Sequence, residues 1–272
     1  MLIYAVVFIG FMLTVVTAYA GSASDTTASV MRLEKTGGSV KVTQSSGKEA
    51  KVIEKMRLNS GDDVKSAAKS YAYISLDDSK AVKLDENSQA KVKKDGKKLE
   101  VALEAGNLIF DVDKALSGDE SFEIKTTTMT MGIRGTCAQV ERKSATHTSV
   151  TLLDGTLACT VTDPKTGNSQ SVVLRPGEHA DFHTGEAYTN NVQIIKRKVT
   201  LSDLRGFAVQ YILENKATAA RILKSSGLDL AGQPQAQEEE EHPSDSHHSG
   251  GDISGNDGRK SPTADWYSKK QG

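Results

Sequence analysis

The feature that most constrains the fold is an alternation of apolar and polar residues that recurs in short stretches between Gly38 and Phe182. In one such stretch, Ala72, Ile74 and Leu76 are separated by tyrosine and serine residues. A period of two places every second side chain on one face of an extended strand, whereas a helix needs a period of 3.6. Similar stretches occupy residues 40–42, 82–84, 90–92, 99–103, 109–112, 122–124 and 150–152. This region is therefore predicted to consist of short strands.

Glycine and polar pairs separate these stretches and predict tight turns, as at Lys94-Asp95-Gly96 and Asp154-Gly155. A weak repeat of strand, glycine turn and second strand recurs as LEAGNLIF, LLDGTLACTV and LRPGEHADF. We therefore expect a mainly β fold, which is either a short-strand β-solenoid or a curled β-sandwich. Periodicity alone does not separate these two arrangements.

Residues 184–231 are predicted to form a connector followed by one amphipathic helix over about 200–226, because the apolar spacing changes there to three and four. Thr200 and Asp203 form a capping signature, and Gly227 is a stop signal. The helix is expected to weaken near Asn215. We expect its apolar stripe to cover an open end or face of the strands, and a helix that binds a partner is the alternative.

Residues 1–20 form an uncharged apolar stretch that ends in Ala18-Tyr19-Ala20. Small residues at these positions are typical of a cleaved export signal, so residues 1–20 are predicted to be a signal peptide and residues 21–36 a linker. No lysine or arginine precedes the apolar run, and an uncleaved membrane anchor is therefore the alternative. After cleavage we expect no membrane span, and a periplasmic or extracellular location.

Residues 232–272 contain four consecutive glutamates, Glu238 to Glu241, followed by many Ser, Gly, Asp and His residues. Such a composition cannot bury enough apolar surface to offset the loss of chain entropy on folding. This tail is therefore predicted to be disordered.

The charges of the chain nearly cancel, with 34 Lys and Arg residues against 35 Asp and Glu residues. This balance gives no electrostatic reason to expect nucleic acid as a partner. The sequence contains neither a G-x-S-x-G nucleophile turn nor a phosphate-binding glycine loop placed between a strand and a helix. We therefore expect a protein that is not an enzyme and that needs no cofactor.

Four segments in order carry a resemblance: SYAYISLDDSKAVKLDENSQAKV, LEVALEAGNLIFDVDKA, FEIKTTTMTMGIRGTCAQVE and SVTLLDGTLACTV. Over residues 37–183 this order resembles the FecR-type domain of bacterial envelope proteins. The resemblance implies an exported β-domain. In the iron-dicitrate sensor type of this family, the domain follows a cytoplasmic segment that binds a sigma factor and a membrane helix. Here the export signal stands first, so we expect the anti-sigma half to be absent.

Cys137 and Cys159 are the two cysteines of a chain that is predicted to be exported, which makes a disulfide between them the natural hypothesis. The strand alternation opposes it, because Cys159 shares a face with Leu157 and Val161 and should point inward. Cys137 is opposite in parity to Ala138 and should point outward. Two separate thiols are the alternative.

His179, Asp181 and His183 occupy alternate positions of one predicted strand and share a face on which they could chelate zinc or iron. The outer two are too far apart to hold one ion unless the strand bends, and a solvated strand face is the alternative. Arg134 lies in a turn flanked by Gly132 and Gly135 and is a candidate for binding an anionic ligand.

Together these features predict an exported, non-enzymatic protein of the bacterial envelope that binds a protein partner or an envelope polymer such as cell-wall glycan. The alternative is a periplasmic signalling component that regulates a separate membrane anti-sigma or transporter system. The sequence does not indicate an oligomeric state.

Overall fold

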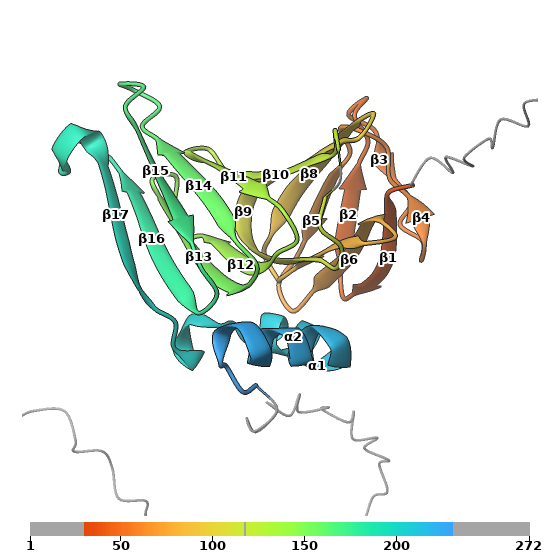
Figure 1. The fold of residues 1–272 in the computed structure, drawn as a ribbon. Coiled ribbons are helices and arrows are strands. Elements are labelled where there is room, and N and C mark those ends of the chain that lie inside the picture. Colours follow the sequence, from red (N-terminus) through yellow and green to blue (C-terminus); the bar gives the residue numbers. More distant parts are fainter. Residues whose placement is uncertain (1–29, 117, 231–272) are drawn as a thin grey trace, which may run out of the picture. The chain divides into compact units, whose positions relative to one another are not determined.

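The computed structural model describes residues 30–116 and 118–230, within which 17 strands form one hydrogen-bonded network. The network forms two sheets, A and B, and the long strand β9 (Lys98–Val112) belongs to both of them (Figure 1). In spatial order, sheet A contains β4 (Met56–Arg57), β1 (Arg32–Gly37), β6 (Tyr71–Asp77), β7 (Lys80–Leu84), the second half of β9, β12 (Cys137–Arg142), β13 (His147–Asp154), β16 (Glu178–Thr184) and β17 (Val192–Lys198).

Sheet B follows a matching order around the first half of β9. It contains β3 (Glu49–Ala50), β2 (Val40–Thr43), β5 (Asp63–Ser66), β8 (Gln89–Asp95), the first half of β9, β10 (Ser121–Lys125), β11 (Met129–Ile133), β14 (Leu157–Thr162) and β15 (Ser169–Leu174).

The strand β9 passes from one sheet to the other at Gly106, which has a φ of +79°. Residues 98–105 pair with β8 in sheet B, and residues 106–112 pair with β7 and β12 in sheet A. Every pairing among the described strands is antiparallel except that of β9 with β10. A β-helix stacks parallel strands. Of the two predicted arrangements, the structure is therefore the curled sandwich, and the predicted mainly β fold is confirmed.

The main core lies between the two sheets and is built from the alternating side chains that the sequence indicated. Ala72, Ile74 and Leu76 of β6 are at most 1% exposed. Phe110 of sheet A meets Phe122 of sheet B edge to face, with ring centroids 6.1 Å apart. A period of two in the sequence thus becomes one apolar face on each sheet, and the two faces pack against each other.

Two helices, α1 (Gly206–Glu214) and α2 (Lys216–Ser226), replace the single helix predicted over about 200–226 (Figure 1). The chain breaks at Asn215, which is extended (φ −115°, ψ 96°) and whose side-chain oxygen accepts hydrogen bonds from the backbone N–H groups of Ala217 and Thr218. Asn215 therefore ends one helix and caps the next. The predicted stop is confirmed, since Gly227 takes a left-handed conformation with a φ of +73°.

Two short 3₁₀ turns accompany these elements: η1 (Thr189–Asn191) precedes β17, and η2 (Leu201–Asp203) precedes α1. The capping signature is confirmed but belongs to η2, where the Asp203 carboxylate accepts from the backbone N–H of Thr200 at 2.7 Å.

The helices cover the face of sheet A that points away from the main core. A second apolar cluster forms there between Ile109, Cys137 and Leu153 of the sheet and Ile212 and Ile222 of the helices. Of the two sequence interpretations, the covering helix is therefore the one that the structure has.

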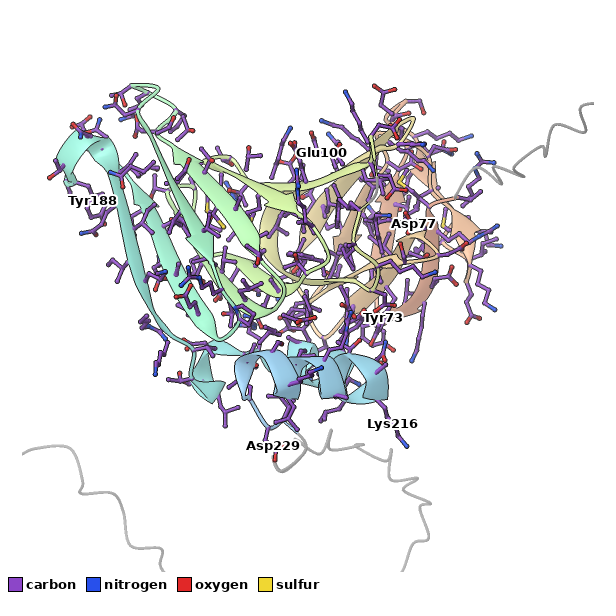
Figure 2. The ribbon with its side chains drawn as sticks, viewed as in Figure 1. Tyr73, Asp77, Glu100, Tyr188, Lys216 and Asp229 are labelled. Atoms are coloured by element: carbon purple, nitrogen blue, oxygen red, sulfur yellow. The ribbon has the colours of Figure 1, made fainter. Side chains whose placement is uncertain are left out.

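Polar contacts reinforce this layer. The Lys83 ammonium donates to the Phe207 carbonyl at 3.1 Å, and the buried Asp111 carboxylate accepts from Arg221 at 2.6 Å. Tyr73, labelled near the helices in Figure 2, donates from its hydroxyl to the Glu214 carboxylate at 2.5 Å. The helix layer is thus fixed to sheet A by both apolar and charged groups.

The β-domain extends beyond the predicted limits of 37–183 at both ends. The strand β1 begins at Arg32, inside the predicted linker, and Leu33 is fully buried in the main core. The strand β17, inside the predicted connector, extends sheet A to Lys198. The predicted signal peptide (1–20), most of the linker and the acidic tail (232–272) lie outside the described residues. Among the described helices, none combines the length and the apolar character that a membrane crossing requires.

Candidate functional site

The densest group of metal-ligating side chains in the described part of the chain lies on the outer face of sheet A, where β13 and β16 pair. His147 at the start of β13 is the direct cross-strand partner of His183 on β16. One ligating atom from each of His147, Asp181 and His183 lies within 4.8 Å of the other two. The imidazole Nε2 of His147 is 2.8 Å from Asp181 Oδ1, and the two histidine rings have centroids 4.0 Å apart.

His179, the third residue of the predicted metal set, does not join this group as a ligand. It is 3% exposed, and its Nε2 lies 3.3 Å from Asp181 Oδ2, the oxygen that faces away from His147. Its Nδ1 lies 2.9 Å from the hydroxyl of Thr151, its cross-strand partner. His179 therefore orients the Asp181 carboxylate, and His147 stands where the prediction had placed His179.

The sequence interpretation did not propose His147 as a ligand because it considered residues along one strand. Alternate residues of a strand are about 6.6 Å apart, whereas directly opposite residues on antiparallel neighbours are about 4.5–5.5 Å apart. The cross-strand neighbour is therefore the better partner, and finding it requires the strand register. The only sequence signal was a further histidine, His147, shortly before the strand predicted over residues 150–152.

Burial and neighbouring charges shift the pKa values of the side chains in and beside the cluster. Burial works to raise the pKa of Asp181, but hydrogen bonds from His147 and Lys143 outweigh it and hold the pKa below its ordinary value. Burial lowers the pKa of His183, and the neighbouring His147 lowers it further. Burial likewise lowers the pKa of His179, against the opposing attraction of Asp203. The Asp181 carboxylate therefore lies beside two imidazoles, those of His179 and His183, whose neutral forms are favoured.

Tyr188, labelled in Figure 2, lies in the connection between β16 and β17 and closes one side of the cluster. Its ring centroid is 5.5 Å from that of His183. His147, Asp181 and His183 are each partly exposed, so the cluster is open to solvent on the remaining side. A small ion could enter without any rearrangement of the backbone.

The two cysteines are free thiols, so the structure does not contain the predicted disulfide. Cys159 faces the core between the sheets, whereas Cys137 faces the helix layer on the other side of sheet A. This placement agrees with the parity argument and with the alternative of two separate thiols. Burial raises the pKa of the Cys159 thiol to about 12 and that of Cys137 well above its ordinary value. Neither thiol is therefore an activated nucleophile.

Arg134 is exposed in the turn between β11 and β12, as predicted. Gly155 approaches the same turn so closely that a Cβ on it would lie 2.1 Å from the Gly135 carbonyl oxygen. The turn is therefore held by a close backbone contact. Anion binding by the exposed Arg134 side chain stays a prediction.

A family model described as FecR protein matches residues 62–158. Two crystal structures of an anti-sigma factor candidate from Parabacteroides distasonis ATCC 8503, at 1.65 Å and 2.50 Å resolution, are similar to the chain at 15% and 16% sequence identity. The alignments have TM-scores of 0.43 and 0.40 and cover 53% and 50% of this chain. They span 63% and 59% of the length of those structures.

No curated protein matches the chain by sequence. The family match begins just before β5 and ends within β14, and it includes all of β9. It therefore covers the central strands of both sheets. The predicted resemblance is confirmed over this span, where residues 62–158 match the FecR family model.

Proposed function

We propose that this chain is an exported, non-enzymatic FecR-type protein of the bacterial envelope that acts by binding another protein. The family match supports the type of domain, and the apolar N-terminal segment supports export. The observation that carries the proposal is the uncharged, unpaired edge of sheet B at β15 (Ser169–Leu174).

The edge strand β15 has a register pairing with β14 alone among the described strands, so the other side of its backbone makes no sheet hydrogen bonds. Near its start, the Gln170 side chain donates to the Val192 carbonyl of β17 at 3.4 Å. The strand contains no charged residue, and Val173 is 53% exposed. Edge strands of soluble proteins usually carry charges that prevent pairing with other chains. The other edge strand at this end, β17, does so with Lys196, Arg197 and Lys198.

The face beside this edge is also uncharged. Thr160 and Ser171 approach to 2.9 Å across β14 and β15, and Thr162 and Ser169 approach to 3.2 Å. Small hydroxyl side chains leave the edge backbone accessible. We infer that an extended segment of a partner protein adds to β15 as a further strand, with backbone hydrogen bonds for affinity and an apolar contact at Val173 for specificity.

Photo-crosslinking in the native organism tests this proposal. A benzoylphenylalanine placed at Ser171 or Val173 is expected to capture the same protein, identified by mass spectrometry. The same probe at the exposed Lys65 of β5, in the same sheet, is the matched control and should not capture it. Adding Val173→Lys to the Ser171 probe should abolish the adduct, because the new charge protects the edge. Adducts with cell-wall glycan alone, or equal adducts at Lys65, would contradict the proposal.

A second candidate function is regulation of a separate membrane anti-sigma or transporter system, and the FecR family match favours it. Under this function, the protein captured at β15 is a membrane regulator. Deleting the chain should then change transcription of the genes that this regulator controls, and Val173→Lys should reproduce the change. If the transcript profile is unchanged while the β15 adduct still forms, the protein binds its partner but does not regulate these genes.

Export has a direct test in the mass of the mature protein. Cleavage after Ala20 leaves an N-terminus at Gly21. A mature chain that still begins at Met1 would contradict the cleaved signal and favour the membrane anchor.

A further inference from the structure

The side chains of His147, Asp181 and His183 converge from two neighbouring strands onto one partly exposed point of sheet A. The cross-strand pairing fixes the backbone positions of His147 and His183, because each strand is also paired on its other side. From this geometry we propose that the three residues bind one divalent cation of the zinc type, through two imidazole nitrogens and one carboxylate oxygen.

The donor set selects the class of metal. Two imidazoles favour zinc and the neighbouring transition metals over calcium and magnesium, which prefer oxygen ligands. Zinc binds nitrogen and oxygen at about 2.0–2.2 Å in a tetrahedral arrangement, which places the ligand atoms about 3.4 Å apart. The donor atoms lie within 4.8 Å of one another, and one pair is at 2.8 Å. Side-chain rotations that move the ligand atoms by about 1 Å therefore complete the site, with a fourth coordination position left for water.

Neighbouring side chains hold one of the proposed ligands, Asp181, in a fixed orientation. Asp181 is held by His179 through its Oδ2, so that its Oδ1 points at His147. A buried group that orients a ligand in this way is typical of built metal sites. His179 is in turn fixed by Thr151, and its Nδ1 lies 3.8 Å from the Asp203 carboxylate. His179 is therefore a positioning residue for the site.

Lys143 makes the site testable, because its ammonium lies 3.3 Å from the same Asp181 oxygen that would bind the metal. The lysine side chain is 38% exposed and can move away when a cation arrives. Since two cations then compete for one oxygen, removing the lysine charge should strengthen metal binding. A purely structural role for this cluster makes no such prediction.

Isothermal titration calorimetry with Zn²⁺ tests the proposal on the full chain. Of its six histidines, three (His242, His247 and His248) lie in the C-terminal tail, so the reference protein carries alanine at these three positions. This reference is expected to bind one Zn²⁺ per chain. His147→Ala with His183→Ala should abolish that binding, and the nearly isosteric Asp181→Asn should weaken it by about 10–100-fold. A reference protein that binds no Zn²⁺ would overturn the proposal.

Lys143→Met and His179→Gln separate coordination from folding. Lys143→Met should tighten Zn²⁺ binding several-fold, whereas His179→Gln should weaken it by about 10-fold. With Co²⁺ in place of Zn²⁺, the reference protein should gain visible absorption bands of a four-coordinate site. Circular dichroism establishes that each variant is folded. Unchanged affinity and unchanged Co²⁺ bands in a folded variant without His147 and His183 would show that the metal binds elsewhere and would refute this site.

Discussion

Gly106 occupies the point where β9 leaves sheet B for sheet A, and two independent features make it irreplaceable. Its φ of +79° is unfavourable for any residue with a side chain. A Cβ there would also lie 2.3 Å from the Ser88 hydroxyl and 2.7 Å from the Asn87 carbonyl oxygen. Gly106→Ala is therefore expected to destabilise the protein by at least about 2 kcal/mol in urea unfolding.

Gly96 is a matched control for this substitution. It has a φ of +56°, but a Cβ on it would meet nothing within 4 Å. Gly96→Ala should therefore cost only the backbone strain, about 1 kcal/mol. Equal losses for the two variants would show that the close approach of β9 to Ser88 contributes nothing.

The two thiols provide a second prediction at the residue scale. Because Cys137 and Cys159 are buried on opposite sides of sheet A, a thiol reagent such as DTNB should modify neither in the native protein and both in guanidinium. The result should be the same without added reductant. An unfolded, non-reduced protein in which DTNB detects no free thiol would show that the two cysteines are bridged and would contradict this prediction.

Asp203 couples stability to pH. Hydrogen bonds from Arg197 hold the pKa of Asp203 well below its ordinary value, with further donors from Thr200. The unfolded chain therefore binds a proton at Asp203 before the folded chain does, so stability falls as pH drops below about 5. Asp203→Asn should reduce this acid-side slope of the unfolding free energy. The exposed Asp78→Asn removes the same charge from a side chain without these partners and is the matched control for the loss of a carboxylate.

At the scale of elements, Asn215 separates α1 from α2, and its side chain accepts from two backbone N–H groups of α2. Asn215→Ala removes this cap and should destabilise the protein by about 1 kcal/mol. Asn215→Asp retains an acceptor and adds a favourable charge at a helix N-terminus, so it should be neutral or stabilising. Urea midpoints of the three proteins measure the effect, and identical midpoints would contradict the capping role.

The same residue explains why one helix was predicted where two exist. The apolar spacing of three and four continues through residues 204–223, since both helices bury the same side against sheet A. Periodicity therefore predicted where the apolar side chains of the helices point, but it did not reveal that a single residue interrupts the helix.

For β17 the limit is different, because Val192–Lys198 is an edge strand rich in Lys and Arg with little alternation. Its pairing with β16 depends on the neighbouring strand more than on its own sequence.

The candidate site was likewise predicted from the sequence only in part. The sequence placed Asp181 and His183 on one strand face, and the opposite facing of the two cysteines followed from the same alternation. His147 is 34 residues from Asp181, and only the register between β13 and β16 brings the two together. Register depends on turns and on long-range pairing, which a single sequence does not specify. Local patterns therefore predicted the faces, and the tertiary fold selected the partners.

On the scale of the whole molecule, the FecR-type match over residues 62–158 is smaller than the unit that shares one core. Leu33, Val42 and Phe182 lie outside the match, yet all three are buried between the sheets. The helices α1 and α2 also lie outside it and cover Ile109 and Cys137 of sheet A. A fragment limited to the match would therefore expose both apolar clusters.

This leads to a prediction about the cooperative unit. A fragment of residues 30–230 contains both sheets and the helix layer, so it should unfold in urea in one transition with the midpoint of the full chain. A fragment of residues 62–158 should show no cooperative transition, because the loss of β1, β2, β16 and both helices leaves each sheet without part of its partner surface. The fragment 37–183 tests the sequence-based limits. Without β1, β17 and the helices it should be less stable than 30–230, and equal midpoints would show that these outer elements add nothing to the core.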